Sequence, residues 1–157
     1  MSDRGRSFTD ADERAMRLAL VEAERAQSHG DVPIGAVVVQ GEQTLAVACN
    51  ERELQGDPTA HAEILALRGA AAQLGGWRLP ETTLYITLEP CAMCAGAIVL
   101  ARVPKVVYAA ADPKAGAAGS IIDLLDNPAL NHHPEVAAGL LAEEAGELLR
   151  GFFRARR

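Results

Sequence analysis

Apolar residues recur at helical spacing near the beginning of the chain and again near its end. Between residues 10 and 30 they lie three or four positions apart, which predicts a long amphipathic helix that Gly30 ends. Asp10 and Glu13 resemble a capping box at the start of this helix. The same spacing over residues 139–153 predicts a second amphipathic helix. Each of these helices therefore has one apolar face to bury.

Between these two helices the apolar residues stand next to one another instead of recurring at intervals. Residues 34–40 and 44–49 are apolar runs on either side of Gly41 and Glu42, which predicts a hairpin. Residues 82–88 and 105–110 predict two more strands. Consecutive apolar residues are typical of a sheet that is covered on both faces.

Two further helices are predicted among these strands, over residues 60–74 and residues 91–102. The second of them lies between two predicted strands. Because a strand, a helix and a strand of these lengths form a crossover unit, we expect the two strands to pair in parallel. Residues 50–59 and 127–134 are polar and turn-like, so we predict loops there.

The composition is that of one globular domain. The chain has 157 residues, of which 49% are hydrophobic and 23% charged, enough to bury a single core. We interpret residues 1–157 as a single domain, with residues 1–7 flexible and residues 154–157 forming a basic tail. The polar N-terminal residues do not resemble a signal peptide, and no apolar run has the length of a membrane span. We therefore expect a cytoplasmic protein that does not enter a membrane.

The chain is acidic, with a formal net charge of -6. This charge argues against a surface that binds nucleic acid everywhere, because phosphate binding needs clustered lysine and arginine. A local basic patch is still compatible with it, and the candidates are Lys114 and the tail residues Arg154, Arg156 and Arg157. The helix dipole favours arginines at the end of a helix. The tail is therefore either a solvated helix end or a phosphate-binding segment.

Histidine and cysteine supply the candidate metal ligands. Three cysteines in a chain without a secretion signal favour metal or thiol chemistry over disulfide bonds. Cys91 and Cys94 are three residues apart on a predicted helix, so both sulfurs can reach one ion. With His61 they form the set expected of a zinc site that keeps its fourth position for water. Cys49 is interpreted as a small apolar residue within a strand.

Glu63 follows His61 by two positions and is the candidate proton shuttle. A carboxylate beside a zinc site can take a proton from water and pass it to a leaving nitrogen without serving as a ligand. Residues two apart on a regular helix, however, point to opposite sides. Either the first turn bends, therefore, or only one of the two residues is helical.

Two structural alternatives bear on this part of the chain. A zinc site that only stabilises the fold would need a fourth ligand, and no candidate has the short spacing usual for such sites. The candidates are Cys49, His29, His132 and His133. We therefore favour an open, catalytic site. The glycine-rich residues 112–120 do not have the lysine and hydroxyl residue that complete a phosphate loop, so we interpret them as a flexible connection near the site.

The motifs of the chain are Asn50, residues 57–64, residues 84–97 and residues 114–120. Together they resemble those of the bacterial tRNA-specific adenosine deaminases, which are zinc-dependent nucleobase deaminases. The resemblance implies an α/β fold of three layers, αβα, with a central five-stranded mixed sheet between helices. It also implies a homodimer, and the hydrolytic conversion of adenosine to inosine at the wobble position of an arginine tRNA anticodon.

The resemblance assigns roles to individual residues as well. It implies one Zn²⁺ per subunit, held by His61, Cys91 and Cys94, with Glu63 as the catalytic proton shuttle. The substrate-binding residues that it implies are Asn50, Ala62, Asp112 and Lys114.

Two other functions stay open at the level of the sequence. One is the deamination of a free nucleobase or nucleoside, such as cytidine or guanine, by the same zinc chemistry. The other is a non-catalytic RNA-binding protein that zinc stabilises. Such a protein has no use for a carboxylate beside the metal, so Glu63 distinguishes it from an enzyme.

Overall fold

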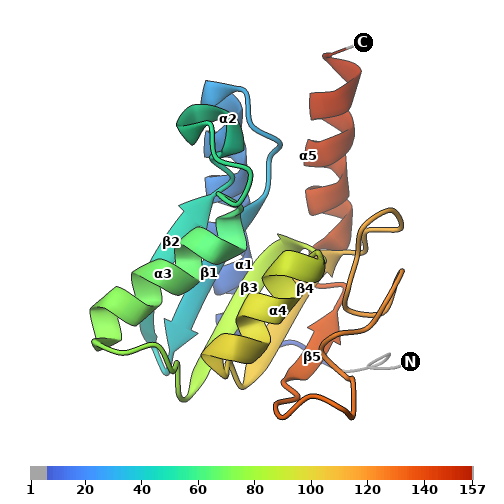
Figure 1. Cartoon of the computed structure of the whole chain (residues 1–157). Coiled ribbons are helices and arrows are strands. Elements are labelled where there is room, and N and C mark those ends of the chain that lie inside the picture. Colours follow the sequence, from blue (N-terminus) through green and yellow to red (C-terminus); the bar gives the residue numbers. More distant parts are fainter. Residues whose placement is uncertain (1–6, 157) are drawn as a thin grey trace.

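The computed structural model describes residues 7–156, which form a central sheet between two layers of helices (Figure 1). The strands are β1 (Gly35–Gln40), β2 (Gln43–Cys49), β3 (Thr82–Leu88), β4 (Lys105–Ala110) and β5 (Glu135–Ala138). The helices are α1 (Asp10–Ala26), the 3₁₀ turn η1 (Gln27–His29), α2 (Arg52–Gln55), α3 (Ala62–Leu74), α4 (Ala92–Ala101) and α5 (Ala142–Arg154).

The five strands form one mixed sheet in the order β2-β1-β3-β4-β5. β1 is antiparallel to both β2 and β3, and the predicted hairpin closes where Gln40 pairs with Gln43. β3, β4 and β5 run parallel to one another, with α4 as the crossover between β3 and β4. The predicted parallel pair and the mixed five-stranded sheet are therefore confirmed.

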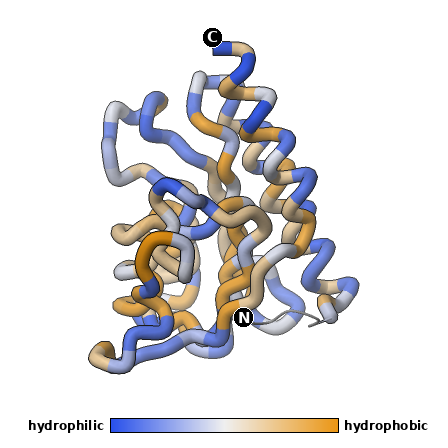
Figure 2. Tube along the Cα trace, turned by 90° about the vertical axis from the view of Figure 1, so that its right-hand side faces the viewer, coloured by the Kyte–Doolittle hydropathy of each residue, from blue (hydrophilic) through white to orange (hydrophobic). Residues whose placement is uncertain are grey.

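Both faces of the sheet are covered, as the consecutive apolar residues predicted. Along β3, Leu84 and Ile86 pack with α3 and α4 on one face, whereas Tyr85 packs with α1 and α5 on the other. Successive side chains of a strand point to opposite faces, so every interior strand needs apolar residues at each position. Figure 2 shows the result, since hydrophobic stretches gather in the middle of the molecule while hydrophobic and hydrophilic residues alternate along α5.

Several predicted boundaries need correction. The capping box of α1 is formed by Thr9 and Asp12, not by Asp10 and Glu13, because each of the former bonds the backbone of the other. The predicted loop over residues 50–59 contains the short helix α2.

In the last third of the chain, the structure differs from the elements that the hydrophobic pattern predicted. β5 was not predicted, because its four residues are too few to show a period and only its pairing with β4 defines it. α5 begins at Ala142, after Leu141 adopts the left-handed conformation, so the helix predicted from residue 139 starts three residues late.

Residues 1–6 and Arg157 lie outside the described residues, and with them most of the segment expected to be flexible and the last residue of the expected basic tail. Within residues 7–156, no helix has the length and apolar character to cross a membrane.

Candidate active site

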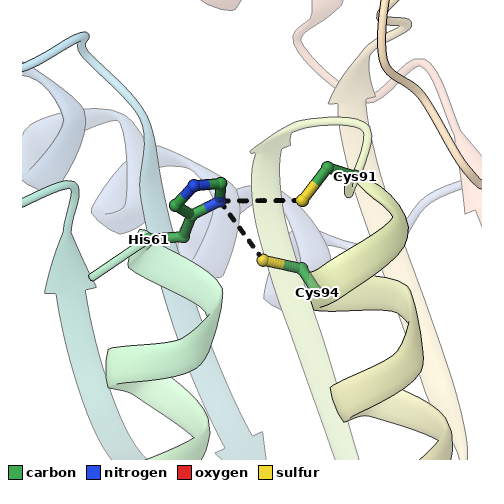
Figure 3. A group of neighbouring side chains, drawn as sticks. All are labelled: His61, Cys91 and Cys94. Carbon is green, nitrogen blue, oxygen red and sulfur yellow. Dashed lines mark hydrogen bonds between the residues drawn. The ribbon is translucent and has the colours of Figure 1, made fainter. Parts of the chain in front are cut away.

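The site lies where α3 and α4 begin, beside the carboxyl end of β3 (Figure 3). His61 is the N-cap of α3 and Cys91 is the N-cap of α4, and both have extended backbones. Cys94 lies in the first turn of α4. Nδ1 of His61 is 3.7 Å from Sγ of Cys91 and 3.5 Å from Sγ of Cys94, and Figure 3 shows the imidazole facing both sulfurs.

These three side chains fit a zinc ion. A tetrahedral zinc with bonds of about 2.3 Å to sulfur and about 2.0 Å to nitrogen holds those ligand atoms about 3.5 Å apart. The three ligand atoms all lie within 4.8 Å of one another, and no other His, Cys, Asp or Glu of residues 7–156 belongs to the group. The protein thus offers three ligands, which is the number found in catalytic zinc sites.

The two thiols share protons in a way that suits metal binding. The hydrogen bond from Cys94 lowers the pKa of the Cys91 thiol to about 3, with His61 contributing further. The same bond, together with burial, raises the pKa of the Cys94 thiol. The hydrogen bond with Cys91 also raises the pKa of His61, although burial opposes this. A low thiol pKa favours the thiolate, which is the form of cysteine that binds a metal.

Glu63 is buried beside this group, with 4% of its surface exposed. It belongs to the first turn of α3, whereas His61 precedes the helix, so the two side chains can approach the same space although they are two residues apart. Of the two possibilities left open by the sequence, the second is therefore the one observed. Burial raises the pKa of the Glu63 carboxyl to about 7, although the nearby His61 opposes the shift.

The group opens into a pocket of about 760 Å³. His61, Glu63 and Cys91 line it on one side, and residues 110–115 line it after β4. The lining also includes five residues of α5 that the sequence did not indicate, namely Ala142, Gly146, Leu149, Arg150 and Phe153. Their helical spacing predicted only an amphipathic helix, and nothing in the pattern showed which other element the helix faces.

Asn50 and Ala62 occupy different positions relative to this pocket. Asn50 is buried at the end of β2 and lines the pocket. Its side-chain oxygen accepts a hydrogen bond of 3.2 Å from the backbone N–H of Ala62. Ala62 is fully buried and is not among the lining residues. Because its oxygen is engaged, Asn50 can offer its NH₂ group to a ligand.

Asp112 and Lys114 lie at the mouth of the pocket, on the glycine-rich segment. Oδ1 of Asp112 accepts the backbone N–H groups of Lys114 at 3.0 Å and Ala115 at 3.2 Å, which fixes a tight turn. The segment expected to be a flexible connection is thus held by an internal network. The backbone N–H groups of Ala118 and Ser120 donate hydrogen bonds to Glu89, so these two groups are not free to bind a phosphate.

Basic side chains from three elements surround the pocket, although the chain is acidic overall. They are Arg52 of α2, Lys114 of the segment after β4, and Arg150 of α5. The basic tail is arranged differently. Arg154 lies 3.5 Å from Glu147, and the guanidinium of Arg156 lies over the ring of Phe152 at 3.7 Å.

The remaining histidines and Cys49 have partners away from the three ligands. Nδ1 of His29 lies 2.7 Å from Asp31, while His132 and His133 bond backbone oxygens. Cys49 is fully buried in β2, as predicted, and burial raises the pKa of its thiol to about 11. None of these residues joins the His61, Cys91 and Cys94 group, so none provides the fourth ligand that a purely structural zinc site would need.

Comparison with known proteins agrees with this geometry. The model of the MafB19-like deaminase family matches residues 10–157. The tRNA-specific adenosine deaminase of Bacillus subtilis (strain 168) is 50% identical over 143 residues, which cover 91% of this chain and 89% of the relative. The chain belongs to the tRNA-specific adenosine deaminase family. The resemblance seen in the sequence motifs is thereby confirmed.

Solved structures of deaminases have the same fold. One from biochemical and structural studies of A-to-I editing by tRNA:A34 deaminases at the wobble position of transfer RNA superposes with a TM-score of 0.84 and 46% identity, covering 87% of this chain and 99% of that chain. Guanine deaminase from Nitrosomonas europaea superposes with a TM-score of 0.75 and 27% identity, covering 93% and 86%. This member of the tRNA-specific family therefore shares its fold with deaminases of free bases.

Proposed function

We propose that the protein deaminates adenosine to inosine at the wobble position of a tRNA anticodon, that of an arginine tRNA. The observation that carries the proposal is Glu63, which is buried beside the His61, Cys91 and Cys94 group and lines an open pocket. Similarity to enzymes named for tRNA adenosine deamination supports the choice of substrate. Because the proposed substrate is tRNA, we also propose a cytoplasmic location.

Glu63 is the residue that we assign to proton transfer. Deamination at C6 of adenine replaces the amino group with oxygen from water, so a proton must leave the water and another must reach the departing ammonia. We assign one zinc ion per subunit to His61, Cys91 and Cys94; when bound, it lowers the pKa of water toward neutrality. Glu63 is buried in the pocket lining beside these residues, where a carboxylate oxygen can accept the proton and return it to the leaving nitrogen.

The lining of the pocket suits a nucleotide. The NH₂ group of Asn50 can donate to an acceptor on the base, and Phe153 offers an exposed ring on which an unpaired base can stack. Asp112 and Lys114 lie at the mouth, where they can contact the ribose and the phosphate of the anticodon loop. Ala62 acts through its backbone, because its N–H holds the Asn50 oxygen and so orients the amide.

Basic residues at the pocket favour RNA over a free base. Arg52 and Lys114 place positive charge in the pocket lining, and Arg150 lies there paired with Glu143 and Glu147, whereas a neutral nucleobase would not require such charge. An anticodon loop presents unpaired bases, so turning one into the pocket costs less than opening a duplex. The acidic charge of the whole chain only requires that such basic groups be local.

The test is to incubate zinc-loaded protein with an arginine tRNA anticodon stem-loop that carries a wobble adenosine. Free adenosine, cytidine and guanine are incubated in parallel. We expect inosine in the stem-loop and no reaction of the free compounds. Deamination of guanine or cytidine beside an unreacted stem-loop would retain the zinc chemistry and contradict the RNA substrate.

We further propose that two copies form a homodimer through α4. This helix has no charged residue, yet the side chain of Leu100 is 70% exposed and a Cβ added at Gly96 would meet no atom within 4 Å. A helix that is apolar on all sides is normally buried. Sedimentation equilibrium should give twice the 16.6 kDa mass of the chain for the wild type and for Val21→Glu, a control on α1, but the monomer mass for Leu100→Glu. A monomeric wild type would contradict the proposal.

A further inference from the structure

Glu89 is a buried carboxylate that is neither one of the proposed zinc ligands nor the proposed proton shuttle. It directly follows β3 and stands two residues before the proposed ligand Cys91, and only 2% of its surface is exposed. An ionised carboxylate in such a position must have its oxygens bonded, since burial of an unpaired charge is very costly. The partners of Glu89 therefore show what the residue is for.

The carboxylate of Glu89 accepts four hydrogen bonds, and all of them come from three residues of the segment after β4. Its Oε1 accepts the N–H of Asp112 at 2.9 Å, and its Oε2 accepts the N–H groups of Ala118 at 2.9 Å and Ser120 at 3.1 Å. The hydroxyl of Ser120 also donates to Oε1. One side chain thus holds the beginning and the end of residues 112–120, which we call the mouth segment.

Gly116 shows how closely the mouth segment wraps this carboxylate. A Cβ added at Gly116 would collide with Cδ and both carboxylate oxygens of Glu89. Gly116 does not have a positive φ, so its backbone conformation is open to other residues and the carboxylate accounts for the glycine. The middle of the mouth segment is thereby packed against the same group that bonds its two ends.

Glu89 itself lines the pocket, and it also acts on other lining residues through Asp112. Glu89 fixes the backbone of Asp112, and the carboxylate of Asp112 in turn accepts the N–H groups of Lys114 and Ala115. Asp112, Lys114 and Ala115 all line the pocket. A second attachment, from the N–H of Ala117 to the oxygen of Pro90 at 2.8 Å, does not involve the Glu89 side chain. Loss of the carboxylate would therefore loosen the mouth segment without detaching it.

We propose that Glu89 is a positioning residue that holds the mouth segment in its substrate-binding conformation. Because Glu89 lies two residues before the proposed zinc ligand Cys91, it connects the candidate zinc site to the residues that recognise the RNA. The coupling to RNA rests on the proposed function, whereas the holding of the segment does not. Glu89 acts through Asp112 and Lys114 and does not itself transfer a proton.

Hydrogen exchange tests the holding of the segment without any activity. In Glu89→Gln, an NH₂ group replaces one acceptor oxygen, so amide exchange of residues 112–120 should accelerate by about tenfold, as expected for the loss of a hydrogen bond to a charged group. Asp31→Asn is the matched control, because Asp31 is also buried and accepts the N–H groups of Glu53 and Leu54 in α2. Its effect should appear at α2. Unchanged exchange over residues 112–120 in Glu89→Gln would overturn the proposal.

Kinetics on the anticodon stem-loop tests the coupling to substrate. Glu89→Gln should raise KM about tenfold and change kcat less than about twofold, because the variant weakens binding and leaves Glu63 in place. Zinc content should stay at one per chain. A fall in kcat together with loss of zinc would overturn the proposal, because Glu89 would then stabilise the zinc site. An unchanged KM together with faster amide exchange over residues 112–120 would overturn the coupling to substrate. An inactive wild type would instead contradict the proposed function, while exchange would still decide whether Glu89 holds the segment.

A double substitution provides a check that does not depend on the chemistry of Gln. Gly116→Ala should raise KM in the wild type, because the new methyl group displaces the carboxylate. In a Glu89→Ala background the space is already free, so the same substitution should have a smaller effect. Equal effects in both backgrounds would show that the two residues act independently and would overturn the proposal.

Discussion

His61 and Glu63 lie two residues apart, yet both line one pocket because only the second is helical. The extended backbone of His61 turns its imidazole toward α4, and the first turn of α3 buries the carboxylate beside it. A sequence can show this pair and the chemistry that it suggests. A sequence cannot show that the side chain of Asn50 accepts the N–H of Ala62 in the first turn of α3, because the two residues are twelve positions apart.

Glu63→Ala tests the assignment of the proton shuttle. Turnover of the stem-loop should fall by at least about a hundredfold, since proton transfer by a positioned side chain contributes about 10²–10⁴. Zinc content, measured by elemental analysis, should be unchanged because Glu63 is not in the ligand group. If the variant lost its zinc, Glu63 would instead be a ligand.

At the scale of elements, the three proposed zinc ligands come from two helices that pack on the same face of the sheet. His61 begins α3, while Cys91 and Cys94 lie in the first turn of α4 or just before it. An ion held by both helices binds the folded state and not the unfolded chain, so it stabilises the fold by mass action.

Cys91→Ser should therefore lose zinc, turnover and stability together. Chelation of the wild type should lower its free energy of unfolding by about 4 kcal/mol if free zinc had exceeded its Kd about a thousandfold. Urea unfolding with and without chelator measures this difference. The chelator should not change the stability of Cys91→Ser, and a variant with full zinc content would show that the ligand set is wrong.

A hydrogen bond between α1 and β3 makes a second prediction at this scale. The hydroxyl of Tyr85 donates to the buried carboxylate of Asp12 at 2.7 Å. Burial would raise the pKa of Asp12, but the bonds from Thr9 and Tyr85 outweigh it and hold that pKa below its ordinary value of 3.8. Since the pKa is lower in the folded state, the ionised carboxylate stabilises the fold above about pH 4, and this contribution is lost as the pH falls through the folded pKa.

Tyr85→Phe should cost about 1–3 kcal/mol of stability at pH 7, because Asp12 stays buried with one donor fewer. The cost should shrink at a low pH, below the lowered pKa of Asp12, where the carboxylate is protonated in the folded protein. Urea unfolding of the zinc-free protein at both pH values measures it, and in an Asp12→Asn background the cost should not depend on pH. An equal cost at both pH values in the wild-type background would contradict the assignment.

The elements also show how far the sequence alone could lead. Long apolar runs and helical periods predicted α1, α3, α4, α5 and four strands, because each buries a face that its own residues define. β5 and α2 were missed because they have only four residues each and depend on neighbours. The roles of Glu89 and Arg150 were missed for a similar reason, since each faces partners that only the folded chain brings near.

On the scale of the whole molecule, an acidic chain presents basic side chains where the substrate would enter. Arg52, Lys114 and Arg150 come from three elements that meet only at the pocket. Arg150 also pairs with Glu147 at 2.7 Å, as Arg17 pairs with Glu13 at 2.8 Å on α1. Both are exposed helical arginines that pair with a glutamate, although Arg150 also pairs with Glu143 at 3.1 Å, and of the two it is Arg150 that lines the pocket.

Arg150→Gln should weaken stem-loop binding and lower the salt dependence of the affinity by about one counterion. Arg17→Gln, the matched control, should change neither quantity. Fluorescence anisotropy at a series of salt concentrations measures both. If the two variants behaved alike, the basic residues at the pocket would be ordinary solvated charges.

The most direct test of the account is to map inosine along a full-length arginine tRNA after reaction with the zinc-loaded protein, with Glu63→Ala as the blank. Sequencing reads inosine as guanosine, so every adenosine is tested in one experiment. We predict conversion at the wobble adenosine alone, and none with Glu63→Ala. Conversion at other adenosines, or none at the wobble position, would contradict the proposed function.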